Sequence, residues 1–243
     1  PMDEANVDGY HVPHALSLSE IHQLVDDFGY GVRRLVASGF RFLEVHAAHG
    51  YLIHSFYSPI SNCRTDAYGG DRARRMRFAL EVAESVRSNW PDEFPLSFRI
   101  SSIDAVDRGW DLDDSLVLVR ELKSRGVDVI DCSSRGVGAA NSLARLEKEG
   151  KSLEEGYQVP YSEYLRKEVP IPTIAVGLIT RAEFAEKILQ DGRADLIALG
   201  RELLYNPHWV LHAASALENE TKWNDWPPSW NWWLEKRERL GIK

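Results

Sequence analysis

Five short apolar segments alternate with helical patterns along this chain, and this alternation limits the folds that it can adopt. The apolar segments are residues 40–45, 95–101, 127–133, 172–177 and 194–200. Helical patterns fit residues 17–38, 72–90, 113–125, 161–168, 180–190 and 201–217. Strands that are apolar without polar alternation, separated by helices, are typical of a parallel sheet with helices on its faces. The sequence therefore predicts an α/β fold around one parallel sheet.

Two of the expected helices begin with the capping-box spacing, in which Ser or Thr is followed three residues later by Glu. The pairs are Ser17 with Glu20, and Thr180 with Glu183. In a capping box the two side chains satisfy backbone N–H groups that the first turn of a helix leaves unpaired. We therefore expect side-chain caps at both of these helix starts.

A doubly wound sheet and a (β/α)8 TIM barrel both fit this order of elements. No G-x-G-x-x-G motif follows any predicted strand, which disfavours the doubly wound sheet as a dinucleotide-binding fold. Polar residues and glycines instead gather at the carboxyl ends of the strands, where barrels carry their active sites. They are His46, His49, Arg99, Ser101, Asp104, Ser133, Ser134, Gly177, Gly200 and Arg201. We favour the barrel, and because a closed barrel needs eight strands, about five βα units predict an incomplete one.

The composition argues against several classes of function. The chain has 243 residues, enough for one large domain or two small ones, and its net charge of −8 argues against a nucleic-acid surface. No run of about 18 apolar residues exists, so no membrane span is expected. No signal peptide is visible, and two cysteines, Cys63 and Cys132, are too few for a disulfide framework. We expect a protein of the reducing cytoplasm.

The segment 44–71 places His46 and His49 where a strand ends, with Tyr51 two residues further on. A zinc site is one interpretation, with His54 as a third ligand, but no H-E-x-x-H or comparable ligand spacing supports it. Two structural histidines are the second interpretation. In the third, the two imidazoles donate to one substrate oxygen that gains charge, and the phenol of Tyr51 delivers a proton.

Three further residues at strand ends suggest an anion site. Gly177 and Gly200 end the last two strands, next to which barrels commonly bind phosphate, and Arg201 follows directly. Taken singly, each glycine is equally compatible with an ordinary turn. Arg99 lies within an apolar strand and needs an anionic partner, because an unpaired buried charge is costly. That partner is either a carboxylate on another strand or a cofactor group that becomes negative on reduction.

Several motifs together resemble the old yellow enzyme family of FMN-dependent ene-reductases. The resemblance runs from about Pro13 to Leu217 and extends to the Trp-rich end of the chain. It rests on "EVHAAHGYLIHSFYSPISNCRTDAYGGD", "FRIS", "VDVIDCSS", "GYQVPYSEYLRK", "AVGLIT" and "GRADLIALGRELLYNPHW". The pair His46-x-x-His49 is similar to the thermophilic-like branch, where other members carry His-x-x-Asn.

The resemblance implies a role for each of these positions. His46 and His49 would hydrogen-bond the carbonyl or nitro oxygen of the substrate, and also a bound nicotinamide. Tyr51 would protonate the carbon alpha to the activating group. Arg99 would lie at the N1/O2 edge of the flavin.

The FMN phosphate would be held, by the same resemblance, at Gly177, Gly200 and Arg201. The implied reaction is ping-pong: NADPH or NADH gives hydride to FMN, and an activated alkene then receives it. No metal is implied.

The resemblance also indicates what the chain lacks. Residues 1–217 would be the part of the FMN-binding barrel equivalent to strands 4–8, without the three strands that supply further flavin contacts. Because the sequence opens with Pro1-Met2, either an initiator Met was removed or the chain begins inside a longer protein. A non-catalytic or partner-dependent fragment is therefore the alternative to an active ene-reductase, and a complementing N-terminal barrel segment is a possible partner. A family member that uses flavin for an isomerisation is a third hypothesis, which Tyr51 disfavours.

Two segments carry weaker expectations. Residues 135–156 form a charged excursion that we interpret as a surface loop, with a substrate lid as the alternative. Residues 218–243 contain five of the eight tryptophans, and we expect this tail to pack on the barrel or on a partner subunit of a homo-oligomer.

Overall fold

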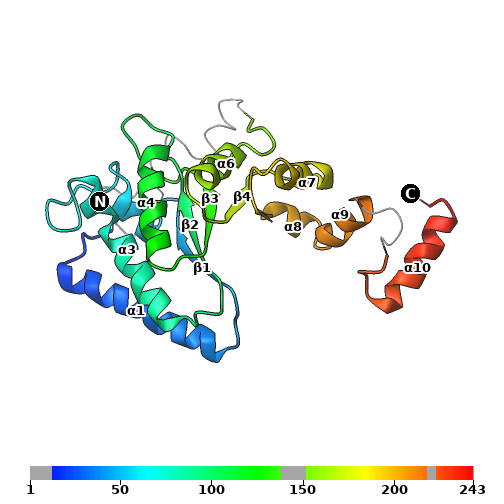
Figure 1. The fold of residues 1–243 in the computed structure, drawn as a ribbon, viewed down its shortest axis with the longest axis horizontal. Helices are drawn as coiled ribbons and strands as arrows, with labels where there is room; N and C mark the ends of the chain where they lie inside the picture. Colours follow the sequence, from blue (N-terminus) through cyan, green and yellow to red (C-terminus); the bar gives the residue numbers. More distant parts are fainter. Residues whose placement is uncertain (1–12, 138–151, 218–222, 243) are drawn as a thin grey trace.

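The chain folds around one five-stranded parallel sheet (Figure 1). The computed structural model describes residues 13–137, 152–217 and 223–242. The strands are β1 Leu43–Ala47, β2 Leu96–Ser101, β3 Val129–Ser133, β4 Thr173–Val176 and β5 Leu196–Ala198. They pair in chain order, β1-β2-β3-β4-β5. A doubly wound sheet reverses its strand order at a switch point, whereas a barrel does not, so this order is that of five successive units of a (β/α)8 barrel.

Helices connect the strands and several of them cover one face of the sheet, whereas those after β5 extend away from it (Figure 1). Four of them precede β3: α1 Leu18–Ala37, α2 Leu52–Tyr57, α3 Arg72–Asn89 and α4 Leu112–Ser124. The later ones are α6 Val159–Glu168, α7 Ala182–Gln190, α8 Arg201–Tyr205, α9 Trp209–Leu217 and α10 Pro228–Arg239. No helix in the described ranges is long and apolar enough to cross a membrane.

The two faces of the sheet differ in character. Toward the helices, Phe98, Ile100 and Ile130 are fully buried, and each contributes roughly 1.5–3 kcal/mol by leaving water. The opposite face corresponds to a barrel interior. One row across it, fixed by strand register, consists of His46, Arg99, Asp131, Ile174 and Leu196.

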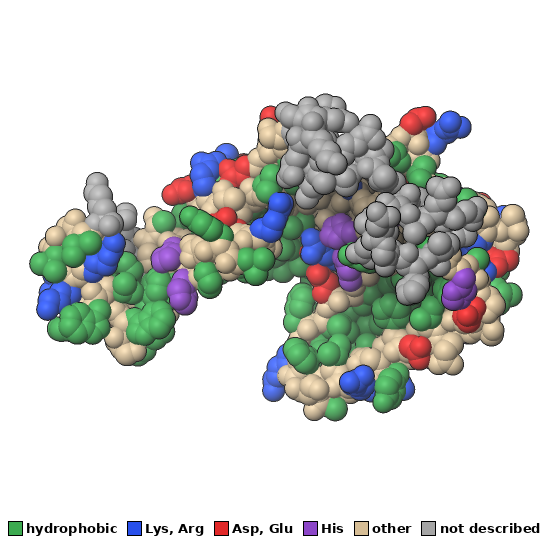
Figure 2. Space-filling view, turned by 180° about the vertical axis from the view of Figure 1, so that it is seen from behind, with side chains coloured by type: hydrophobic (Ala, Val, Ile, Leu, Met, Phe, Trp, Pro, Cys, Tyr) green, Lys and Arg blue, Asp and Glu red, His purple; other side chains and the backbone are tan. Residues whose placement is uncertain are grey.

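The interior face is partly open, as expected for a barrel with five strands. Leu196 is 46% exposed on β5, and His46 is exposed on β1. The row on β1 to β3 is polar and charged, with His46, Arg99 and Asp131. Figure 2 shows histidine side chains close to basic and acidic ones beside a hollow on this side of the molecule.

The first predicted capping box is present and the second is not. At α1, the backbone N–H of Glu20 donates to Ser17 Oγ over 3.3 Å, and that of Ser17 donates to Glu20 Oε2 over 2.7 Å. At α7 the helix begins at Ala182 without a side-chain cap from its own N-cap residue. The reason is a competing carboxylate: Glu155 accepts the backbone N–H and the hydroxyl of Thr180.

Other boundaries differ from the sequence expectations. The first strand begins at Leu43 rather than at residue 40, because Phe40 and Phe42 remain half exposed. The last strand spans three residues instead of seven. The helix expected over 201–217 is divided into α8 and α9, with Pro207 between them. Proline lacks an N–H donor and disfavours helical geometry at the residue before it, here Asn206.

The Trp-rich tail contacts α9 of its own chain through Trp226. This ring is 5% exposed, and its centroid lies 5.6 Å from that of His208 and 5.2 Å from that of His212. On α10, by contrast, Trp232 and Trp233 are 54% and 59% exposed. Residues 138–151, which make up most of the charged excursion, lie outside the described residues.

Candidate active site

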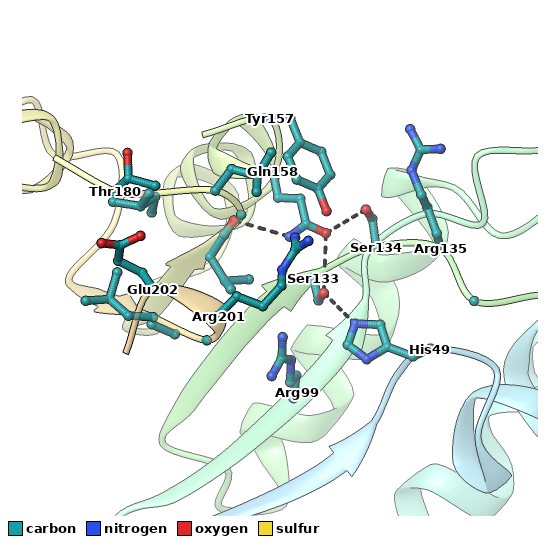
Figure 3. Close-up of a pocket in the computed structure, with 18 of the residues that line it drawn as sticks. His49, Arg99, Ser133, Ser134, Arg135, Tyr157, Gln158, Thr180, Arg201 and Glu202 are labelled. Atoms are coloured by element: carbon teal, nitrogen blue, oxygen red, sulfur yellow. Dashed lines mark hydrogen bonds between the residues drawn. The ribbon is translucent and has the colours of Figure 1, made fainter. Parts of the chain in front are cut away.

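A cavity of about 680 Å³ lies at the carboxyl ends of β2 to β5. Five residues predicted from the sequence line it: His49, Arg99, Gly177, Gly200 and Arg201. They come from segments more than 150 residues apart, and Figure 3 shows Arg99 and Arg201 on the same side of His49. Residues to which the sequence gave no role also line it, among them Ser133, Ser134, Arg135, Tyr157 and Gln158.

His46 and Tyr51 lie beside this cavity without lining it. The ring centroid of His46 is 5.1 Å from that of His49 and 5.3 Å from that of Tyr51. Tyr51 is the N-cap residue of α2 and is 64% exposed. The structure therefore brings the three predicted catalytic side chains together as one aromatic cluster at the mouth of the cavity.

The backbone around His49 is held in an unusual conformation by side chains from other strands. His49 has a φ of 61°, in the left-handed region that non-glycine residues rarely adopt. Its N–H donates to Ser101 Oγ over 2.9 Å, and that hydroxyl donates in turn to the carbonyl of Arg135. Gly50 follows with a φ of 78°, where an added Cβ would collide with the carbonyl of Gly136. Glycine is therefore required at position 50.

His54 is a structural residue and not a metal ligand. Its ring and the carboxylate of Asp104 are both fully buried and lie 2.8 Å apart. The N–H of Gly50 donates to His54 Nδ1 over 2.8 Å, so the ring proton is on Nε2 and faces Asp104. Ser58 and the backbone of Trp110 donate to the other carboxylate oxygen. Within the described residues, no group of three His, Cys, Asp or Glu side chains could hold a metal.

The two histidines at the cavity are neutral at pH 7. Burial, and next the positive charge of Arg99, lower the pKa of His49 to about 4. The same two causes, in the same order, lower the pKa of His46. A neutral imidazole has one N–H, so each ring is a donor through one nitrogen and an acceptor through the other.

The anionic neighbour that Arg99 requires is Asp131 on the next strand. Arg99 Nε lies 3.4 Å from Asp131 Oδ2. Burial raises the pKa of Asp131 to about 7, although the charge of Arg99 opposes the shift. Among the described residues, Arg99 Nε and Asp131 Oδ1 are buried without a hydrogen-bond partner. The pairing is thus incomplete, and the guanidinium of Arg99 still lines the cavity.

The anion end of the cavity differs in part from the expectation. A side chain added at Gly200 would meet no atom within 4 Å, so the backbone of Gly200 is open to a ligand, whereas Gly177, with a φ of 125°, is packed against Gln158 and Tyr157. Arg201 is exposed beside them. The first backbone N–H groups at α7, however, already donate to Glu155, which makes them unavailable to an anion.

Sequence reasoning gave no role to Gln158, which is 3% exposed and contacts both serines at the end of β3. It precedes α6 as N-cap without capping it through its side chain. In the sequence, the feature that could have indicated Gln158 is a polar residue between Tyr157 and Val159, shortly before a predicted helix. The structure shows both of these neighbours at least half buried.

Comparison with known proteins places this arrangement in a family. The family described as "NADH:flavin oxidoreductase / NADH oxidase family" matches residues 1–220. An NADPH dehydrogenase of Bacillus velezensis is 41% identical over 220 residues, covering 90% of this chain and 61% of that protein. One of Geobacillus thermodenitrificans is 44% identical over 205 residues, covering 84% and 57%. An NADH oxidase of Thermoanaerobacter brockii is 38% identical over 210 residues, covering 86% and 32%.

Solved structures agree on the fold. A 2-naphthoyl-CoA reductase in complex with 2-naphthoyl-CoA superimposes with a TM-score of 0.76 at 22% identity, over 84% of this chain and 30% of that one. Histamine dehydrogenase from Rhizobium sp. 4-9 gives a TM-score of 0.68 at 26% identity, over 81% and 28%. The chain spans about 57–61% of the length of the two NADPH dehydrogenases. It belongs to the NADH:flavin oxidoreductase / NADH oxidase family, whose cofactors are FMN and NADPH or NADH.

Proposed function

We propose that this chain is the substrate- and phosphate-binding part of an FMN-dependent oxidoreductase that reduces the activated C=C bonds of enones or nitroalkenes. The observation that carries the proposal is the convergence of His49, Arg99, Gly177, Gly200 and Arg201 on one cavity. FMN held there would supply hydride transfer from NADPH or NADH to the substrate. We propose the cytoplasm as its compartment.

The residues present fit FMN. The phosphate is negatively charged; Arg201 provides a positive charge for it, and the open backbone at Gly200 provides space. A flavin ring edge needs donors, and the Arg99 side chain lines the cavity with only the ion-pair contact of its Nε to Asp131 among the described residues. Arg99, Gly200 and Arg201 all line the same cavity, as a cofactor with both a phosphate and a polar ring requires.

The chain's own side chains would perform three tasks on the substrate. Neutral His46 and His49 would donate to the carbonyl or nitro oxygen, which withdraws electrons from the double bond and gains charge during the reaction. Tyr51 would give a proton to the carbon alpha to the activating group. The hydride and this proton together complete the reduction of the double bond, so the atoms balance.

The binding role of the histidines can be tested with 4-nitrophenol, whose absorbance reports its ionisation. The double variant His46→Ala with His49→Ala should bind the phenol at least about tenfold more weakly, which corresponds to roughly 1.4 kcal/mol. It should retain FMN as well as the unchanged chain does. Loss of FMN together with the phenol would contradict the assignment of these residues to the substrate.

A second proposal is a chain that needs a partner for activity. It is favoured by the coverage of 57–61% of the relatives and by the open interior face around Leu196. The partner would be an N-terminal barrel segment or a second copy of the chain. Sedimentation of the purified chain with and without FMN gives its association state, and an activity assay of each species tests the second proposal. Activity found only in a self-associated or complemented species supports the partner-dependent form.

A further inference from the structure

A chain of hydrogen bonds from β4 ends on the ring of His49 (Figure 3). Gln158 Nε2 donates to the carbonyl of Val176 over 3.3 Å. Gln158 Oε1 accepts from Ser134 Oγ over 2.7 Å and from Ser133 Oγ over 3.3 Å. Ser133 Oγ lies 2.6 Å from His49 Nε2. Nothing in the proposed reaction accounts for this series of contacts.

The orientation of the Gln158 amide follows from the first hydrogen bond, and it leaves an acceptor for Ser133. A backbone carbonyl can only accept, so the Gln158 amide must present its NH2 to Val176 and its oxygen to the serines. Ser133 gives its single proton to that oxygen. With that proton given to Gln158, the Ser133 oxygen accepts from His49, which puts the proton of the neutral His49 ring on Nε2.

We propose that Gln158, acting through Ser133, holds His49 in the Nε2-protonated tautomer. Gln158 and Ser133 are positioning residues in this account, since they act on the substrate through His49. The catalytic meaning rests on the proposed function, whereas the tautomer is a property of the chain itself.

The hydrogen-bonded series Gln158–Ser133–His49, called the relay from here on, has buried side chains at Gln158 and Ser133 and few unsatisfied polar groups. Gln158, Ser133 and Ser134 are 3%, 2% and 6% exposed. A buried amide is costly without hydrogen-bond partners, and here the oxygen accepts two bonds and the NH2 group donates one. Gly177 permits the close approach, because a Cβ there would lie 3.0 Å from Gln158 Nε2.

The relay has a consequence for substrate binding. With its proton on Nε2, His49 can donate to a ligand oxygen only from the side of the ring that faces Ser133, and Nδ1 is an acceptor. A carbonyl or nitro oxygen must therefore replace or share Ser133 Oγ as the acceptor of this proton. A substrate oxygen placed at Nδ1 would face a lone pair and be repelled.

The tautomer can be read directly by two-bond ¹H–¹⁵N correlation spectra of the chain labelled at histidine, recorded at pH 7 without FMN. Protonated and unprotonated ring nitrogens have well-separated ¹⁵N shifts, and His49 is assigned by the signals lost in His49→Gln. We expect His49 to show a protonated Nε2. In Gln158→Met, Ser133 has no acceptor left and should donate to His49, so that Nε2 and Nδ1 exchange shifts.

Two controls separate this effect from a general disturbance. Ser134→Ala removes a contact to the same Gln158 oxygen that does not reach His49, and should leave the His49 shifts unchanged. His54 should stay Nε2-protonated in every variant, because Gly50 and Asp104 fix it independently. If Gln158→Met fails to fold, Ser133→Ala replaces it, with an expected shift of both His49 nitrogens toward the average of the two tautomers.

An Nδ1-protonated His49 in the unchanged chain would overturn the proposal. So would His49 shifts that neither Gln158→Met nor Ser133→Ala alters. The result is independent of the proposed function. A confirmed relay without enone reduction would refute the proposed reaction and leave the relay standing. Enone reduction without the expected His49 shifts would refute the relay and leave the reaction standing.

Discussion

Arg99 Nε lies 3.4 Å from Oδ2 of Asp131, its register partner on the neighbouring strand, and Asp131 is almost completely shielded from water. The two charges attract each other, yet neither the buried Arg99 Nε nor the second oxygen of Asp131 has a hydrogen-bond partner in the described part of the chain. The pair thus places a partly compensated positive charge where the proposed function needs one, and it makes stability depend on pH.

Asp131→Asn should gain stability relative to the unchanged chain as the pH rises from 5 to 8. Burial raises the pKa of Asp131 to about 7, so the folded state holds this proton more tightly than the unfolded state, and the stability that Asp131 contributes falls as pH rises through this range. The contribution is about 2 kcal/mol, and the amide, which does not ionise, lacks it. Urea unfolding at both pH values measures the difference, and equal pH dependence in the two proteins would contradict the shifted pKa.

Asp104→Ala should destabilise the fold by about 3 kcal/mol, because it leaves the buried donors of His54 and Ser58 without their acceptor. The matched control is Asp107→Ala. Asp107 is 92% exposed, and its carboxylate lies 3.5 Å from Arg108 at the surface, so this variant should show no measurable change. Urea titrations of both variants at pH 7 compare them, and similar stabilities would remove the structural role given to the His54–Asp104 pair.

Gly50→Ala should cost more stability than Gly39→Ala, although both glycines have similar positive φ values, 78° and 82°. At Gly39 a side chain would enter open space, so the cost is the left-handed backbone alone, about 1 kcal/mol. At Gly50 it would collide with the backbone of Gly136, and we expect about 3 kcal/mol. The thermal midpoints of the two variants give the comparison, and an equal loss would show that the contact at Gly136 is not tight.

Much of the fold follows from the sequence because it depends on local patterns. The apolar segments identified β2 and β3 within two residues, and the Ser17–Glu20 spacing identified the start of α1. The prediction of a second capping box was wrong because Glu155, 25 residues before Thr180 in the chain, accepts the backbone N–H of Thr180. Local spacing cannot reveal such a competitor.

In the candidate site, too, residues marked by a local sequence pattern were found and residues whose role depends on distant contacts were missed. His49 and Arg99 were found because residues of their type are unusual at the end of a strand or inside one. Gln158 was missed, since its importance comes from the carbonyl of Val176 and the hydroxyl of Ser133, which only the folded chain brings to it. The role of His54 was likewise invisible before Asp104 was placed 2.8 Å away.

Tyr51→Phe should slow reduction of an enone by the reduced enzyme at least about a hundredfold, the usual size of a proton-transfer contribution. Oxidation of NADPH by the FMN-loaded protein should change by less than twofold, because that half-reaction needs no proton from Tyr51. Stopped-flow measurements of the two half-reactions separate them. Tyr30→Phe is the control, since Tyr30 is 56% exposed on α1, outside the cavity. Equal slowing of both steps would exclude Tyr51 as the proton donor.

The most direct measurement is the visible absorption spectrum of the purified chain after addition of FMN and desalting, together with Arg201→Leu and the exposed control Arg108→Leu. The account predicts a retained flavin whose absorbance bands are shifted from those of free FMN. It also predicts weaker retention in Arg201→Leu and unchanged retention in Arg108→Leu. Flavin lost equally from all three proteins would contradict a cofactor site built from the residues of this chain.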